Sequence, residues 1–286
     1  MSAHAEAIRA SLPRAPIYAY WHLLSLDAPT VAVVWCCAFA ASAGVRPPLY
    51  APVALAIATW MLYVADRLLD VRHARATEQL RDRHWFHGRH ATALLAGLAI
   101  AALALGWIVA RDLSRGVLRH ELLLGAAVVI YFAAIHFPIR RFAALHRIPS
   151  KEAIVGVIFA LAVAIPAWTL AMDSTGLFAA VVGFAALCGL NCLVIETMEH
   201  SSAKRSQLPA GSEKLLLILA AGALALVAFR WRSAQNLLLL SISISSLLLF
   251  ALCRLRHRIS SLAFRIAADA ALLTPILFAP WLWMRR

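Results

Sequence analysis

The chain has 286 residues, of which 63% are hydrophobic and 14% are charged, and its mean hydropathy is +0.78. This composition excludes an ordinary water-soluble globular protein and predicts a polytopic membrane protein. The formal net charge of +13 does not indicate a nucleic-acid partner, because basic residues in a membrane protein mainly set its orientation across the bilayer.

Apolar segments recur along the whole chain. A helix needs about 20 mostly apolar residues to cross a bilayer, so we predict an all-α bundle of about nine transmembrane helices. After an N-terminal tail, 1–20, the residues 21–286 are predicted to form a single membrane domain, since the connections are short. Pro166 and Pro275 lie inside spans and are predicted to kink them. The predicted spans lie near 28–45, 48–69, 91–110, 121–137, 152–171, 176–198, 213–229, 234–253 and 261–283.

The distribution of basic residues predicts the orientation. With nine spans and a cytoplasmic N-terminus, most of the 27 Lys and Arg residues fall in cytoplasmic segments, as the positive-inside rule requires. The first apolar segment lacks a small-residue cleavage site, so we interpret it as a retained span and not as a signal peptide. We therefore expect a multi-pass protein of the plasma (inner) membrane.

Two acidic clusters end predicted spans on the same, cytoplasmic, side. Asp66 and Asp70 end the second span, and their four-residue spacing puts them on one helix face. Asn191, Glu196 and Glu199 end the sixth span. Ionisable groups at this depth usually pair or serve a function. Carboxylate oxygens suit Mg²⁺, which commonly bridges protein acids to the phosphates of a substrate.

Arginines follow the first acidic cluster, at positions 67, 72 and 75. The guanidinium fork matches phosphate oxygens, so Arg67, Arg72 and Arg75 are candidates for binding a diphosphate. Acids for a metal, arginines for an anion and an apolar bundle for a lipid tail together predict chemistry on a lipid diphosphate. In the alternative interpretation, Asp66 and Asp70 only form ion pairs with these arginines at the membrane boundary.

Four stretches occur in an order that resembles the UbiA superfamily of intramembrane prenyltransferases, whose members have nine spans. The opening LLSLDAPTVAVVW keeps the family's Leu, Asp27 and Pro29, and LYVADRLLD is similar to the first acidic motif from Asp66 onward. The segment HFPIRRF resembles a Y-x-x-x-K-R stretch, and NCLVIETMEH lies where the second acidic motif is expected. These stretches span residues 23–35, 62–70, 136–142 and 191–200.

The resemblance implies a Mg²⁺-dependent enzyme that moves an isoprenoid from its diphosphate to an unidentified acceptor, aromatic or lipidic, within the bilayer. The catalytic residues carried over by position are Asp66, Asp70 and Glu199. The implied metal ligands are Asp66, Asp70, Asn191, Glu196 and Glu199. The implied diphosphate-binding residues are Arg140 and Arg141, with Arg67, Arg72 and Arg75 nearby.

Several positions depart from the family pattern. Leu62 and Tyr63 replace the leading Asn-Asp of the first motif, His136 replaces a tyrosine and Arg140 a lysine. The second motif offers one amide and two glutamates where the family has aspartates at four-residue spacing. Two alternatives therefore stay open: a membrane terpene cyclase, and a non-catalytic lipid-binding or transport protein that keeps the fold.

Three further residues are candidates for a site near the cytoplasmic side. His22 and Asp27 lie just before the first span, and Asp269 lies early in the ninth. An acid inside a membrane segment is a functional hypothesis by default. Arg265, one helical turn before Asp269, offers a simple ion pair as the alternative interpretation.

Overall fold

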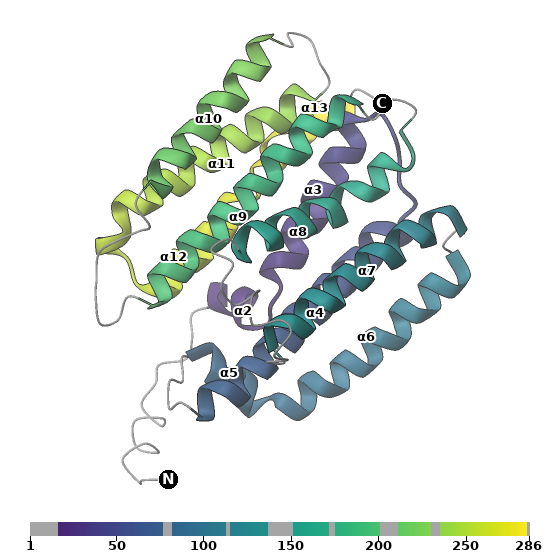
Figure 1. Ribbon diagram of the computed structural model, residues 1–286, viewed down its shortest axis with the longest axis vertical. Coiled ribbons are helices and arrows are strands. Elements are labelled where there is room, and N and C mark those ends of the chain that lie inside the picture. Colours follow the sequence, from purple (N-terminus) through teal and green to yellow (C-terminus); the bar gives the residue numbers. More distant parts are fainter. Residues whose placement is uncertain are drawn as a thin grey trace.

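A computed structural model describes residues 17–76, 82–112, 115–136, 151–171, 175–200, 211–229 and 235–284. These ranges are almost entirely helical, and no strand occurs within them (Figure 1). The helices are α2 (Ile17–Leu23), α3 (Asp27–Ser42), α4 (Tyr50–Ala76), α5 (Asp82–Arg89), α6 (Ala91–Asp112), α7 (Arg115–His136), α8 (Lys151–Trp168), η3 (Thr175–Leu177), α9 (Phe178–His200), α10 (Ser212–Phe229), α11 (Asn236–Leu255), η4 (Arg256–Arg258), α12 (Ser261–Ala271), η5 (Thr274–Phe278) and α13 (Ala279–Met284).

The predicted all-α membrane bundle is confirmed, but the described residues do not show the nine spans that were predicted. Two predicted spans fall on shorter apolar segments of the described residues, Asp27–Ser42 and Leu122–Tyr131. Within the described ranges, seven segments are long and apolar enough to cross a membrane. They are Tyr50–Val71, Ala91–Asp112, Lys151–Trp168, Phe178–Met198, Ser212–Phe229, Asn236–Arg258 and Ser261–Trp281.

Helix α3 lies at the centre of the bundle. It contacts α4 and α8 most extensively, and also α11, α12 and α13 (Figure 1). The two short helices α2 and α5 contact each other in the lower half of Figure 1, and the chain passes from α2 into α3. The first residue of α3, Asp27, therefore lies where elements from both halves of the chain meet.

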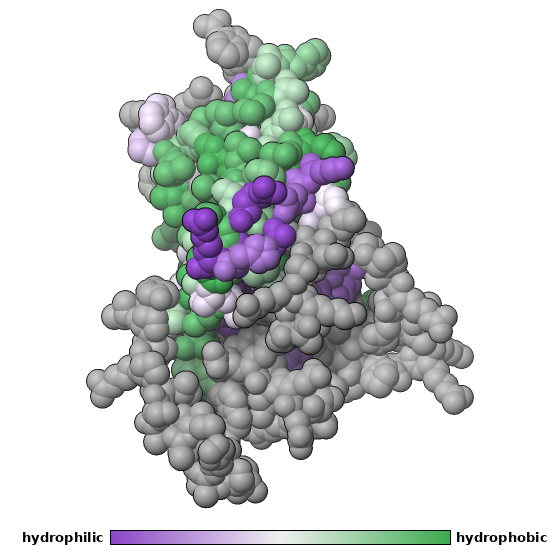
Figure 2. All heavy atoms as spheres, turned by 90° about the vertical axis from the view of Figure 1, so that its left-hand side faces the viewer, coloured by the Kyte–Doolittle hydropathy of each residue, from purple (hydrophilic) through white to green (hydrophobic). Residues whose placement is uncertain are grey.

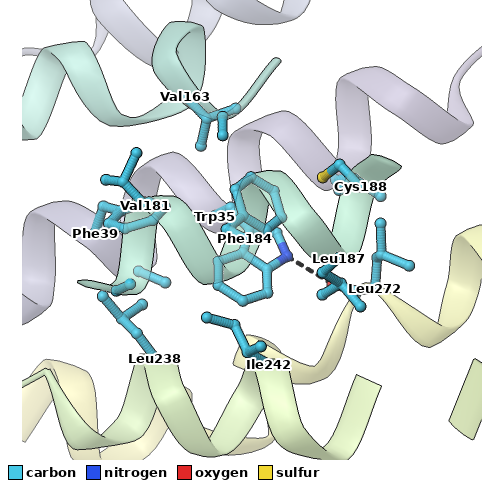
Figure 3. Close-up of a cluster of buried hydrophobic side chains, with 14 of the residues drawn as sticks. Trp35, Phe39, Val163, Val181, Phe184, Leu187, Cys188, Leu238, Ile242 and Leu272 are labelled. Atoms are coloured by element: carbon cyan, nitrogen blue, oxygen red, sulfur yellow. Dashed lines mark hydrogen bonds between the residues drawn. The ribbon is translucent and has the colours of Figure 1, made fainter. Parts of the chain in front are cut away.

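An aromatic cluster packs α3 against α9 in the core (Figure 3). The Trp35 ring stacks on Phe184 with ring centroids 4.1 Å apart, and Phe39 meets Phe184 edge-on at 6.0 Å. Trp35 Nε1 donates to the carbonyl oxygen of Leu272 at 2.7 Å, which ties α3 to the end of α12. Because lipid tails are as apolar as these side chains, close packing and this hydrogen bond stabilise the contact more than exclusion of water does.

Helices α8 and α9 approach each other through glycine. A Cβ atom on Gly156 would lie 2.4 Å from the carbonyl oxygen of Ala185 and 2.6 Å from the amide nitrogen of Gly189. Small residues allow this backbone contact, as is common between membrane helices. The contact fixes the register of the two helices, so that Lys151 at the start of α8 lies beside Glu196 near the end of α9.

The last predicted span, 261–283, is broken and not merely kinked. Helix α12 ends at Ala271, four residues before Pro275, since proline lacks the N–H that an α-helix needs and its ring clashes with the preceding turn. The chain continues as the 3-10 turn Thr274–Phe278. Helix α11 supplies partners at the break: Thr274 Oγ1 donates to the carbonyl oxygen of Ser241 at 2.9 Å and lies 2.7 Å from Ser245 Oγ. Pro166, in contrast, is accommodated near the end of α8.

The outer surface is apolar. On the side of α10 and α11, described side chains are mostly hydrophobic, and hydrophilic ones gather in one patch (Figure 2). Helix α6 exposes Ile100, Leu103 and Trp107 by 66–77%. Contiguous apolar surface of this extent is typical of proteins that face lipid, so a multi-pass membrane protein is supported.

Candidate functional site

A buried polar cluster joins the start of α3 to α2 and α4. His22 Nδ1 lies 2.6 Å from Asp27 Oδ2, and Arg67 Nη2 lies 3.4 Å from the same oxygen. Arg67 Nη1 donates to the carbonyl oxygen of His22 at 2.7 Å, and the amide of Ala28 donates to Asp27 Oδ1 at 3.0 Å. The exposed fractions of His22, Asp27 and Arg67 are 2%, 1% and 3%. Both oxygens of Asp27 therefore accept hydrogen bonds away from water.

A tight turn brings His22 and Asp27 together. Helix α2 ends at Leu23, and Ser25 adopts a positive φ of 58°, which is uncommon for a residue with a side chain. The Ser25 hydroxyl is buried and lies 3.3 Å from His87 Nε2 on α5, which secures the turn. Asp27 then occupies the first turn of α3, where the helix dipole favours a negative charge.

The proton of His22 is fixed by its surroundings. Burial lowers the pKa of His22 below its usual range, and the nearby Arg67 and Arg265 lower it further, although the hydrogen bond to Asp27 acts in the opposite direction. At neutral pH the ring is therefore uncharged, and its Nδ1–H donates to the Asp27 carboxylate. The charge of Asp27 is then balanced by Arg67.

Helices α9 and α12 complete the cluster. Asn191 Nδ2 donates to Asp269 Oδ1 at 3.1 Å, and ligand atoms of His22, Asp27 and Asp269 all lie within 4.8 Å of one another. Asn191 is 6% exposed and its Oδ1 atom has no hydrogen-bond partner, whereas Asp269 keeps accessible surface. Of His22, Asp27, Asn191 and Asp269, only Asp269 is not fully buried.

His22, Asp27 and Asp269 have the proximity of metal ligands, but their charges favour a different interpretation. Both oxygens of Asp27 already accept from protein donors, and Arg67 is bonded directly to this carboxylate. Arg265 also interacts electrostatically with both aspartates. Two guanidinium groups thus oppose the binding of a divalent cation, so we interpret the group as a buried ion-pair cluster.

A second polar group lies where α8 and α9 are in register. Lys151 Nζ donates to Glu196 Oε1 and lies 3.7 Å from Glu152 Oε1. Asp66 on α4, Glu152 on α8 and Glu196 on α9 are each close enough to the hydroxyl of Tyr131 on α7 to interact with it electrostatically. Acids from three helices therefore lie in one part of the bundle, although their oxygens are not all within 4.8 Å of one another, as the ligand atoms of His22, Asp27 and Asp269 are.

The acids predicted from the sequence are distributed between these two groups. Asp66 and Asp70 are half-buried on α4, and Glu196 faces Lys151 on α8. Asn191 and Glu196 are five residues apart, which on an α-helix is one full turn plus about 140°. Asn191 therefore points away from Glu196, to Asp269 on α12. The amide and the glutamate of the second motif therefore contact different helices.

The basic residues predicted from the sequence differ in how far they can be located. The Arg67 guanidinium points into the buried cluster, at Asp27 and His22. Arg72, Arg75 and His136, together with the acid Glu199, belong to α4, α7 and α9, but their side chains lie outside the described part of the structure. Arg140 and Arg141 lie outside the described residues altogether.

Lys151, Glu152 and Tyr131 were not selected from the sequence. The only signal for the first two was a pair of charges at the start of an apolar segment, which is also what an ordinary membrane boundary looks like. Lys151 bonds to Glu196, 45 residues away, and Tyr131 interacts with acids on three other helices, which no local pattern reveals.

Comparison of the chain with protein-family models, with curated proteins and with solved structures finds no match.

Proposed function

We propose that the protein is a Mg²⁺-dependent intramembrane prenyltransferase of the UbiA type, which moves an isoprenoid from its diphosphate to an acceptor. The observation that carries this proposal is that Lys151, Glu152 and Glu196 meet where α8 begins and α9 ends, in the same part of the bundle as Asp66 and Tyr131. Lys151 is the first residue of α8 and Glu196 lies in the last two turns of α9, so the acids gather at one end of an apolar bundle. A polar headgroup would bind there while its hydrocarbon tail lies among the helices.

The available donors suit the metal. Asp66 and Asp70 on α4, with Glu196 and Glu199 on α9, would hold Mg²⁺ through hard carboxylate oxygens, and Asp66, Asp70 and Glu196 keep accessible surface for it. Asn191 is a weaker candidate because its amide is bonded to Asp269. The ion would supply positive charge that stabilises a departing diphosphate.

Lys151 provides a cation beside these acids. Its side chain is 54% exposed and its ammonium bonds to Glu196. With Glu196 engaged by a metal, Lys151 would be the residue that holds a phosphate oxygen there. Arg72, Arg75, Arg140 and Arg141 remain proposed diphosphate ligands, whereas Arg67 supports Asp27 instead.

The proposed topology has nine spans. Helices α3 and α7 would be the two whose apolar segments are shorter, and a cytoplasmic N-terminus would put Asp66 and Glu196 at the cytoplasmic face of the plasma membrane. The excess of Lys and Arg in the segments on that side supports this orientation.

The test is binding of geranylgeranyl diphosphate to the purified protein in detergent, with and without Mg²⁺. We expect Mg²⁺-dependent binding that is lost in the Asp66→Asn/Asp70→Asn double variant. Asp112→Asn is the matched control, because Asp112 ends α6 and pairs only loosely with Arg111, at 4.0 Å. The proposal would be contradicted if the parent protein does not bind geranylgeranyl diphosphate, or if its binding is the same without Mg²⁺ and in the double variant.

Product analysis separates the two remaining alternatives. A cyclic hydrocarbon formed without any acceptor would identify a membrane terpene cyclase. Binding of the isoprenoid without any turnover would identify a lipid-binding or transport protein. Prenylation that requires an added acceptor is the result expected of the transferase.

A further inference from the structure

A group of basic side chains lies where α10 begins and α11 ends, outside both the buried polar cluster and the proposed prenyl-transfer site. We call Lys214 on α10, Arg254 on α11, and Arg256 and Arg258 in the 3-10 turn η4 the basic surface. Lys214, Arg254 and Arg258 are exposed, and Arg256 is partly buried. Figure 2 views the side of α10 and α11 and shows hydrophilic side chains gathered in one patch against apolar helices.

A single carboxylate holds two of these arginines. Arg256 Nη1 donates to Glu213 Oε1 at 2.9 Å, and Arg254 Nη1 lies 3.5 Å from Glu213 Oε2. Arg256 Nη1 also donates to the carbonyl oxygen of Cys253 at 2.7 Å, which fixes η4 against the end of α11. Glu213 is the only acid in the sequence from 211 to 268, so the basic surface keeps an excess of positive charge.

This order exceeds what the orientation of a membrane protein requires. The positive-inside rule depends on the number of basic residues in a segment and not on how their side chains are arranged. Here Glu213 and a backbone carbonyl position Arg254 and Arg256 before any ligand arrives. Side chains that are already ordered lose less conformational entropy when an anion binds to them.

The basic surface lies at the depth of lipid headgroups. The apolar segments Ser212–Phe229 and Asn236–Arg258, each long enough to cross a membrane, begin and end there. The proposed topology puts this end on the cytoplasmic side, whose leaflet carries anionic lipid. Beside the cations, Leu215, Ile218 and Leu255 are 47–65% exposed. Cations at the boundary and apolar side chains next to them match the two parts of a phospholipid.

We propose that the basic surface binds the phosphate headgroup of an anionic phospholipid, whose acyl chains lie along α10 and α11. A guanidinium group donates to two phosphate oxygens at once, and an ammonium adds a point charge. Arg254 and Arg258 supply the main contacts because they are exposed, whereas Arg256 holds Glu213 in place. A zwitterionic lipid fits less well, because its headgroup brings a cation to a surface that is already positive. The site does not depend on prenyl transfer.

Native mass spectrometry of the purified full-length protein in detergent tests this, because it counts the lipids that stay bound as the lipid concentration rises. Phosphatidylglycerol is compared with phosphatidylcholine of the same acyl chains, so that only the headgroup differs. We expect the parent protein to prefer phosphatidylglycerol. We expect Arg254→Gln/Arg258→Gln to bind phosphatidylglycerol at least about tenfold more weakly, and phosphatidylcholine as the parent protein does.

Arg46→Gln/Arg111→Gln is the matched control, because it removes the same charge from two exposed arginines, one after α3 and one near the end of α6. This control should keep the preference. Inorganic phosphate should not displace the lipid, because it has no acyl chains to contact the apolar side chains.

Three results would overturn the proposal. The first is equal binding of both lipids by the parent protein. The second is a loss of phosphatidylglycerol in the control variant as large as that in Arg254→Gln/Arg258→Gln. The third is displacement of the lipid by inorganic phosphate, which would indicate a site for free anions. Should Arg254→Gln/Arg258→Gln fail to fold, the comparison of the two lipids on the parent protein still decides.

Discussion

Replacing Gly156 with alanine is expected to separate α8 from α9. The new Cβ would lie 2.4 Å from the carbonyl oxygen of Ala185, and the nearest obstacles are backbone atoms that no side-chain rotation removes. Ordinary contact begins near 3.4 Å, so the helices must part by about 1 Å. We expect a loss of about 3 kcal/mol of unfolding free energy, at the upper end for an overpacked contact.

Gly222→Ala is the matched control. Gly222 lies inside α10, and nothing lies within 4 Å of the Cβ that it would gain, so alanine should stabilise this helix by up to about 1 kcal/mol. Both variants are compared by reversible unfolding in mixed detergent and SDS micelles, followed by circular dichroism. If Gly156→Ala proves as stable as Gly222→Ala, the close backbone approach of α8 and α9 is wrong.

Three further predictions concern the cluster and the core. The pKa of His22 is lowered on folding, so the unfolded chain binds more protons than the folded protein below about pH 6.5. The free energy of unfolding should therefore fall between pH 7 and pH 5. In a pH series of unfolding midpoints, His22→Gln should flatten this dependence. Arg67→Leu should lower the free energy of unfolding by about 3–5 kcal/mol, because it leaves Asp27 without its counter-charge. The double variant Asp27→Leu/Arg67→Leu should lose less stability than the sum of the two single variants, which a double-mutant cycle measures. Trp35→Phe keeps a ring against Phe184 but leaves the carbonyl oxygen of Leu272 without its donor. The free energy of unfolding in the SDS assay should therefore fall by about 1–3 kcal/mol. An unchanged unfolding midpoint would contradict the importance of this hydrogen bond.

The arginine that follows Asp66 illustrates where sequence reasoning stopped. From the sequence, Arg67 could bind a diphosphate or pair with the adjacent Asp66, and both uses assume a side chain near the membrane boundary. In the structure it turns inward to Asp27, 40 positions earlier in the chain. Its direction depends on how α4 is rotated about its axis against α3, and the low amphipathicity of a membrane helix leaves that rotation undetermined by local pattern.

Asp269 was recognisable as a candidate, but its partner was not. A single acid in an apolar segment is visible in any sequence, and Arg265 four positions earlier was the obvious local partner. The amide that contacts Asp269 comes from α9, 78 positions away. Lys151 and Glu196 are likewise brought together by the glycine contact between α8 and α9 and not by their spacing.

The sequence by itself determined that this is a helical membrane protein, because long apolar segments are a local property that depends on composition alone. It also placed Asp66 and Asp70 on one helix face, which follows from the helical repeat. The tertiary structure decided which polar groups share a site, since this depends on the rotation and register of packed helices. Buried polar groups in lipid must find partners within the protein, so those contacts, made across 40 to 78 residues of chain, define the candidate chemistry.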